Sequence, residues 1–263
     1  MDFGLAQRLA HCMRLFVMLL IAGMTASGFA NESSDSVYVH SDSPMLDVQN
    51  ALDEAKASDK LLLLVMGAQW CHDSRGLAEK FEDPDVAEVL AEHYQTLFVD
   101  VGYYKDLRFI SQRFNQAHYF ATPTVMIIDA DTERLINAKD MHIWGSADSL
   151  PAAKYLDYFT AYASKPLPLF ESVPEKHAAA LTAFEQQNAQ RLTLAYERLV
   201  PAMQLEDRTG EVRDNFLKEW REVRAYRTSL QKDIQSIREQ AVDSPERPLI
   251  FPSYEPFSWD ARP

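Results

Sequence analysis

The sequence predicts an α/β domain that is followed by a pair of long helices and an extended tail. Continuous apolar runs of strand length, such as LLLLVMGA from Leu61, indicate strands that are buried on both faces of a central sheet. Segments with a helical spacing of apolar residues alternate with these runs, which is typical of an α/β architecture. Beyond residue 174 the spacing stays helical through two long segments, so a helical region should follow the sheet.

The first 30 residues resemble a signal peptide in composition. Arg8 and Arg14 precede the apolar run LFVMLLIAGM, and small residues follow as far as Ala30. The apolar run is shorter than the roughly 20 residues that a spanning helix needs, which favours cleavage over a retained membrane anchor. We therefore expect an exported, periplasmic protein whose signal peptide, residues 1–30, is cleaved near Ala30.

Each element of the α/β domain, residues 31–165, has its own sequence signal. Pro44 is a common first residue of a helix, and apolar residues follow it at spacings of three and four. After the turn residues DADT, the segment RLINAKDMHIW fits a further pair of strands. The other expected strands are LLLLVMGA, TLFVDV and TPTVMIID, and the other expected helices are Cys71 to Phe81, Asp83 through DVAEVLAEHY, KDLRFISQRF and PAAKYLDYFTAYA.

Residues 166–243 should form a helical hairpin. Apolar stripes run through residues 175–204 and 211–241, and the two helices are joined near LEDRTG. The tail, residues 244–263, contains five prolines and four aromatic residues, so it should be extended and lie on a surface. The hairpin either packs on itself or on the domain, or it serves as an arm for dimerisation or client binding.

Composition excludes several classes of function. A net charge of -13 leaves no basic surface for nucleic acid. The histidines show no paired metal-ligand spacing, so we expect no metal, and no motif for another cofactor is present. A hydrolase that pairs Cys71 with His118 or His142 is supported by composition alone.

The stretch MGAQWCHDSRG contains the cysteine on which the functional prediction depends. Cys71 would be the single cysteine of the mature chain because Cys12 leaves with the signal peptide, and a lone thiol in an exported protein is a candidate reactive group. Its place at the start of a helix favours the thiolate, since backbone N–H groups and the helix dipole stabilise an anion there. Protonated His72 would add to this effect and Asp73 would oppose it. The alternative is a buried, inert cysteine.

The motif WCHDS between a buried strand and a helix, followed later by TPT at the start of another strand, resembles the thioredoxin-like superfamily. The likeness is greatest to exported members whose first helix and strand read like ALDEAKASDKLLLLVMGAQWC, and it covers residues 45–163. The resemblance implies a thioredoxin-like fold, with a central mixed sheet flanked by helices.

The resemblance also implies roles for individual residues. Cys71 would be the nucleophile, and Thr122 and Pro123 would face it, with the proline in the cis form and the preceding backbone pairing with an extended substrate. Trp70 would shield the thiol. The implied substrate-binding residues are Trp70, His72, Thr122 and Pro123.

Two departures from the family pattern restrict the chemistry. Ser74 stands where two-cysteine members have a second thiol that releases the substrate; its hydroxyl could bond to the Cys71 thiolate but cannot form a disulfide. Val65 stands where the family has a buried acidic residue that assists proton transfer. We therefore expect Cys71 and Ser74 to support monothiol exchange, either isomerisation or removal of glutathione adducts, and no efficient dithiol reduction. Ser74 could equally be an ordinary residue of the first helical turn.

Partners follow from these expectations. They are protein thiols, protein disulfides or glutathione adducts, together with a redox partner protein and a second copy bound through the C-terminal helices. The competing hypothesis is a non-catalytic, chaperone-like protein that binds a client through the domain and these helices, with Cys71 as a residual feature. Thiol reactivity of Cys71 separates the two hypotheses.

Overall fold

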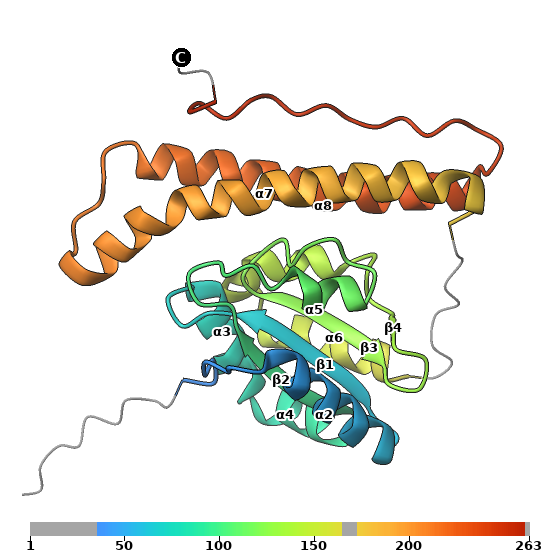
Figure 1. Cartoon of the computed structure of the whole chain (residues 1–263). Coiled ribbons are helices and arrows are strands. Elements are labelled where there is room, and N and C mark those ends of the chain that lie inside the picture. The colour runs from blue at the N-terminus through green and yellow to red at the C-terminus, as the bar shows by residue number, and fades with distance from the viewer. Residues whose placement is uncertain (1–35, 165–172, 261–263) are drawn as a thin grey trace, which may run out of the picture. The chain divides into compact units, whose positions relative to one another are not determined.

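The computed structural model describes residues 36–164 and 173–260. The predicted signal peptide lies outside the described residues. From Val37 onward the chain forms one unit, in which a four-stranded sheet with flanking helices precedes two long helices and an extended tail (Figure 1). The fold class expected from the sequence is confirmed.

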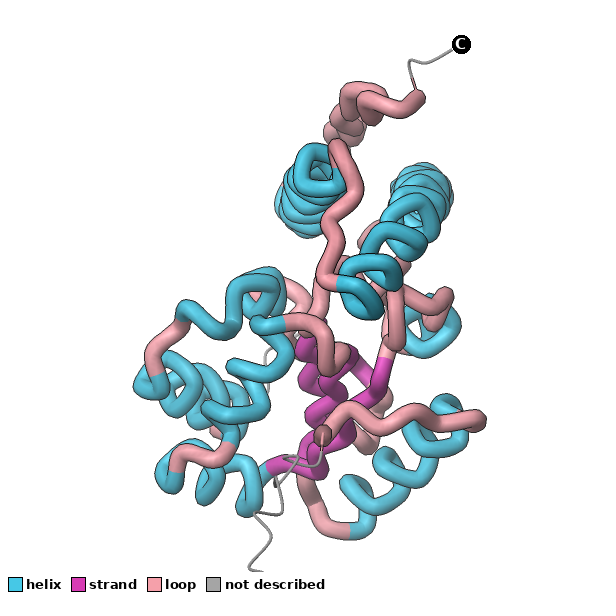
Figure 2. Tube along the Cα trace, turned by 90° about the vertical axis from the view of Figure 1, so that its left-hand side faces the viewer, coloured by secondary structure: helices cyan, strands magenta, loops and turns pink. Residues whose placement is uncertain are grey.

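The sheet is mixed, with strand order β2-β1-β3-β4. Strand β1 pairs in parallel with β2 and antiparallel with β3. All seven residues of β1 are buried, as its continuous apolar run predicted, and helices lie on both sides of the sheet (Figure 2). The strands are β1 (Leu61–Gly67), β2 (Tyr94–Asp100), β3 (Thr124–Asp129) and β4 (Arg134–Leu135).

The helices of the domain begin within a residue of where the sequence indicated, except that the helix expected over KDLRFISQRF begins three residues late, at Arg108. The carboxylate of Asp83 accepts the backbone N–H of Asp85 at 3.2 Å and so caps the helix that starts at Pro84. Cys71 has an extended backbone and is the N-cap of the helix that follows β1. The helices are α2 (Pro44–Ala57), α3 (His72–Phe81), α4 (Pro84–His93), α5 (Arg108–Arg113) and α6 (Ala152–Ala163).

The prediction that RLINAKDMHIW forms a pair of strands is wrong. Only Arg134–Leu135 is strand, and Met141–Ser149 forms a 3-10 helix, η1. The side chain of Asn137 explains the early end of β4: its amide oxygen accepts from Ile127 N at 2.8 Å and its Nδ2 donates to Val125 O at 3.0 Å. A side chain thus satisfies backbone groups of β3 that a longer β4 would have paired.

The helical hairpin consists of α7 (Glu175–Thr209) and α8 (Phe216–Asp243). Helix α7 continues through most of LEDRTG, where a loop was expected, and ends at Gly210, whose positive φ of 72° suits the left-handed conformation that terminates a helix. Buried residues of both helices, including Leu199 and Leu230, belong to the same hydrophobic cluster as the sheet. The hairpin therefore packs on the domain.

The tail lies along the two helices without regular structure (Figure 1). Arg191 of α7 donates to the carbonyl oxygens of Tyr254 and Glu255, and its guanidinium lies 4.5 Å from the ring centroid of Phe257. Phe257 also contacts Tyr226 of α8, edge to face, at 5.3 Å between ring centroids. Aromatic tail residues thus connect α7 and α8. None of the helices in the described ranges is long and apolar enough to cross a membrane.

Candidate active site

Cys71 lies between the start of α3 and the start of β3. Its Sγ donates a hydrogen bond to the carbonyl oxygen of Thr122 at 3.1 Å, across 51 positions of sequence. Cys71 is buried, with 7% of the residue exposed. As the N-cap of α3, Cys71 has the unpaired N–H groups of the first helical turn beside it.

The Thr122-Pro123 peptide bond is cis. This bond immediately precedes β3, and the Thr122 carbonyl oxygen before it accepts from Cys71 Sγ. The Thr122 hydroxyl lies 3.5 Å from the hydroxyl of Tyr104. The structure therefore brings Cys71 and the Thr122–Pro123 pair together, as the resemblance implied.

Ser74 is fully buried and makes different contacts from those expected. Its Oγ accepts the backbone N–H of Ala68 at 3.3 Å, and its carbonyl accepts from Tyr38 OH at 3.1 Å. Among the hydrogen bonds of the described residues, none joins Ser74 to Cys71. Ser74 therefore holds the turn that carries the cysteine, and a direct bond to the thiolate remains a prediction.

Trp70 forms part of an aromatic cover beside the thiol. Its Nε1 donates to Gly102 O at 2.7 Å, which fixes the ring while leaving it partly exposed. Trp220 of α8 meets this ring at 6.3 Å between centroids, so the helical hairpin contributes to the cover. The other aromatic neighbours of Trp70 are Tyr103 and Tyr104.

His72 lies on the solvent side of the thiol. Its side chain is 69% exposed, and its Nε2 lies 3.3 Å from a carboxylate oxygen of buried Asp73. The other oxygen of Asp73 accepts the backbone N–H of Asp148 at 3.1 Å, which ties α3 to η1. His72 can therefore contact a ligand that approaches Cys71, and Asp73 has a structural role in addition to its charge.

A cavity of about 910 Å³ opens onto Cys71. Its volume is within the range of small-molecule sites, about 300–1,000 Å³. Trp70, His72 and Thr122 line it on the domain side, and the hairpin supplies the facing wall. The residues of that wall include Met203, Glu206, Phe216, Trp220, Arg224 and Arg227.

The sequence analysis did not identify Arg227 as a site residue. Its Nη1 donates to the hydroxyls of Tyr104 at 3.1 Å and Tyr196 at 3.3 Å, and 6% of the residue is exposed. One signal was present in the sequence: Arg227 stands between Val223 and Leu230 on the apolar stripe of its helix, at spacings of four and three. A charged residue on a buried stripe indicates a specific polar environment.

The histidines give no support for a Cys-His hydrolase. His118 is buried, and burial lowers its pKa to about 3, so its ring is neutral. Its Nε2 lies 3.3 Å from Thr193 Oγ1 of α7, whereas Cys71 bonds to Thr122. His142 is exposed. Among the described residues no group of three or more His, Cys, Asp or Glu side chains could hold a metal ion.

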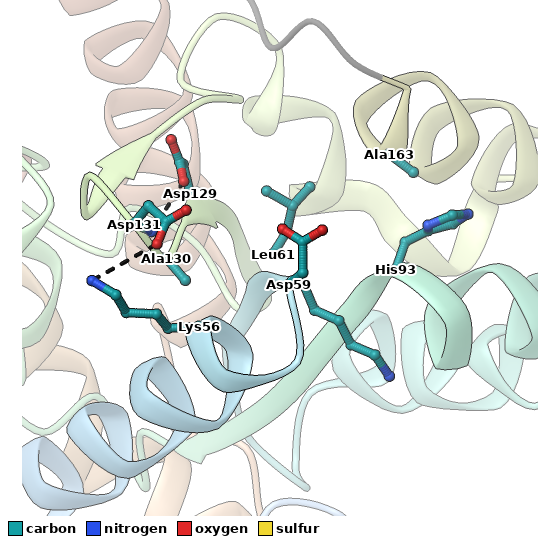
Figure 3. Close-up of a pocket in the computed structure, with 9 residues that line it drawn as sticks. Lys56, Asp59, Leu61, His93, Asp129, Ala130, Asp131 and Ala163 are labelled. Carbon is teal, nitrogen blue, oxygen red and sulfur yellow. Dashed lines mark hydrogen bonds and ion pairs between the residues drawn. The ribbon is translucent and has the colours of Figure 1, made fainter.

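A second cavity lies at the other end of β1 (Figure 3). It is lined by Leu61, the first residue of β1, and by Lys56, whose Nζ lies 3.7 Å from a carboxylate oxygen of Asp131. Its volume is about 70 Å³, which is small for a ligand site. The cavity beside Cys71 is therefore the better candidate for function.

Comparisons with known proteins concern mainly the domain. Residues 43–130 match a family model described as thioredoxin-like. The crystal structure of a disulphide isomerase from Xylella fastidiosa Temecula1 is similar to this chain, with 23% sequence identity and a TM-score of 0.42; the match covers 48% of this chain and 94% of that one. A comparison with curated proteins gave no match.

Proposed function

Because residues 43–130 form a thioredoxin-like domain, we propose that this chain is an exported thiol-disulfide exchange protein that acts through a single thiol, Cys71. The observation that carries the proposal is the position of Cys71. It caps the N-terminus of α3, its Sγ lies against the carbonyl that precedes a cis-proline, and it lines a ligand-sized cavity. Export is inferred from the signal-like sequence of residues 1–30.

The proposed reaction begins with attack of the Cys71 thiolate on one sulfur of a substrate disulfide. A bond forms between Cys71 and that sulfur, the substrate disulfide breaks, and the other sulfur leaves as a thiolate. In a protein substrate this or another thiolate then attacks the mixed disulfide, which forms a new substrate disulfide and restores the Cys71 thiolate. The cycle is isomerisation, and it consumes neither oxidant nor reductant.

A glutathione adduct would follow the same first step with a different release. Cys71 takes up the glutathione sulfur and the protein thiol leaves, after which an external thiol attacks and restores Cys71. Ser74 cannot perform this release because an alcohol forms no disulfide. The chain therefore depends on a second thiol from the substrate or from a small-molecule or protein partner.

The surrounding residues have distinct proposed roles. The N-terminus of α3 stabilises the thiolate, and the Thr122 carbonyl accepts the proton of the thiol in the resting state. Ser74 holds the turn by its bond to Ala68. Trp70 and His72, with the backbone before Pro123, would contact the bound substrate.

Two assays on the same protein test the proposal. Wild-type protein should restore activity to a fully oxidised protein substrate with scrambled disulfides, and it should reduce insulin disulfides slowly in the presence of a dithiol. Cys71→Ser should abolish isomerisation because the nucleophile is lost. Rapid insulin reduction by wild type, or isomerisation that survives in Cys71→Ser, would contradict the monothiol scheme.

A non-catalytic interaction protein is the second candidate, and the burial of Cys71 is the observation that favours it. A client would then bind in the cavity between the domain and the hairpin without exchange at sulfur. The rate of alkylation of native Cys71 by iodoacetamide separates the two candidates. A thiol that reacts only when the protein unfolds would favour the interaction protein.

A further inference from the structure

The hairpin introduces a buried positive charge into the cavity of the candidate thiol. Arg227 belongs to α8, outside the residues that match the thioredoxin-like family model, and it lines the cavity that Cys71 also lines. A guanidinium removed from water requires compensation, either from hydrogen-bond acceptors or from an anion. The contacts of Arg227 show which of the two the protein supplies.

The acceptors that the protein supplies are neutral. Nη1 of Arg227 donates to the hydroxyls of Tyr104 and Tyr196, whose rings stack at 3.8 Å between centroids. Burial raises the pKa of both tyrosines above the ordinary value of 10, so both phenols keep their protons at neutral pH. Among the described residues no carboxylate forms an ion pair with Arg227, and the hydrogen bonds recorded for it use Nη1 alone.

Arg227 is also connected to the thiol. The Tyr104 hydroxyl that accepts from Arg227 lies 3.5 Å from Thr122 Oγ1, and the Thr122 carbonyl accepts from Cys71. Because Cys71 and Arg227 line the same cavity, a ligand sulfur bonded to Cys71 would share that cavity with the guanidinium. A guanidinium presents its N–H groups in a planar fork that matches a carboxylate.

The other charges of the cavity are four carboxylates and two further arginines, Arg75 and Arg224. Asp73, Asp100, Glu206 and Asp207 line it together with Cys71 and Arg227. Because these four carboxylates outnumber the three arginines of the cavity, a ligand that carries only negative charge would be disfavoured. A ligand with both a carboxylate and an ammonium group could place the carboxylate on Arg227 and the ammonium group among the acids.

We propose that Arg227 binds the carboxylate of a small thiol compound of the amino-acid or short-peptide type, whose sulfur exchanges with Cys71. The cavity volume of about 910 Å³ suits a ligand of this size. The inference rests on the proposed function, because it assigns a substrate class to the same thiol. It makes the hairpin a part of the substrate site.

Two alkylating reagents of similar size measure the effect of charge at Cys71. Iodoacetate carries a carboxylate and iodoacetamide is neutral, so the ratio of their rates is insensitive to the fraction of thiolate. Arg227→Gln should lower the iodoacetate-to-iodoacetamide ratio about tenfold, which corresponds to the loss of a charge-assisted hydrogen bond. Arg227→Lys keeps the charge without the fork and should lower the ratio by a smaller factor.

Arg221→Gln is the matched control. Arg221 belongs to the same helix, is exposed and is not among the residues that line the cavity, and its substitution makes the same change in net charge. Its ratio should stay within about twofold of wild type, since exposed charges are screened. An unchanged ratio in Arg227→Gln, or an equal fall in Arg221→Gln, would overturn the proposal.

Calorimetric titration of the wild-type chain tests the site without a variant and without any reaction at sulfur. S-methylglutathione carries two carboxylates and an ammonium group, and its diethyl ester keeps only the ammonium group. We expect the acid to bind about tenfold more tightly than the ester. If the acid and the ester bind with equal affinity, or if the acid does not bind, the carboxylate site is overturned even when Cys71 reacts. If the protein binds the acid much more tightly than the ester but Cys71 is inert, only the exchange function is refuted.

Discussion

Leu199→Ala tests whether the hairpin and the α/β domain unfold as one unit. Leu199 of α7 is fully buried in the cluster that also contains the residues of β1 and β3. The substitution removes three carbon atoms, each worth about 0.8 kcal/mol of transfer free energy. With the cavity that remains, the free energy of unfolding should fall by about 3 to 4 kcal/mol.

The assay is equilibrium unfolding in urea, followed by both far-ultraviolet circular dichroism and tryptophan fluorescence. The two signals should change together in wild type, because one hydrophobic cluster spans the sheet and both long helices. Leu194→Ala is the matched control, since Leu194 belongs to the same helix but is 55% exposed. Its unfolding free energy should stay within about 0.5 kcal/mol of wild type.

Two results would refute this reasoning. One is a pair of separate transitions in wild type, which would make the hairpin an independent arm. The other is a similar cost for Leu199→Ala and Leu194→Ala, which would mean that the inner face of α7 contributes no more to stability than its outer face.

Three further predictions concern single residues. Burial lowers the pKa of His118 to about 3, whereas an unfolded histidine titrates near 6.5, so between these pH values only the unfolded state binds the proton. The free energy of unfolding should therefore fall by about 1.4 kcal/mol for each pH unit below 6.5. Urea titrations at several pH values should show this fall in wild type and a smaller fall in His118→Gln. Asn137→Leu leaves backbone groups of Ile127 and Val125 without hydrogen-bond partners, so the free energy of unfolding in urea should fall by about 3 kcal/mol or more. A fall of less than about 1 kcal/mol would contradict the explanation given for the early end of β4. In Ser74→Cys, the new cysteine should form a disulfide with Cys71, and the variant should gain insulin reductase activity. A thiol titration that still detects both cysteines as free thiols after mild oxidation would contradict this prediction.

The sequence predicted the fold because its strong signals are local. The run from Leu61 is continuously apolar and forms the fully buried β1, and Asp83 and Pro84 start a helix by their own side chains. The segment after β3 was predicted less well since its structure depends on Asn137, whose bonds to the backbone of β3 require the folded sheet. Residue type alone could not indicate that this asparagine would end a strand.

The candidate site was predicted only in part, for a similar reason. Cys71 and Thr122 carry motifs that are recognisable within the domain, and the structure brings them together. The bond of Ser74 to Ala68 depends on the path of the turn, which the spacing of Cys71 and Ser74 does not determine. Arg227 enters the site from a distant helix, and only the packing of α8 on the domain brings it there.

The most direct test of the central claim is detection of a mixed disulfide at Cys71 in the folded protein. The chain is incubated with glutathione disulfide, quenched with acid, and analysed by intact mass and peptide mapping, with Cys71→Ser as the control. We expect one glutathione on Cys71 that persists until an external thiol is added, because Ser74 cannot release it. A native Cys71 that stays unmodified, while the same residue is modified once the chain is unfolded, would contradict the account.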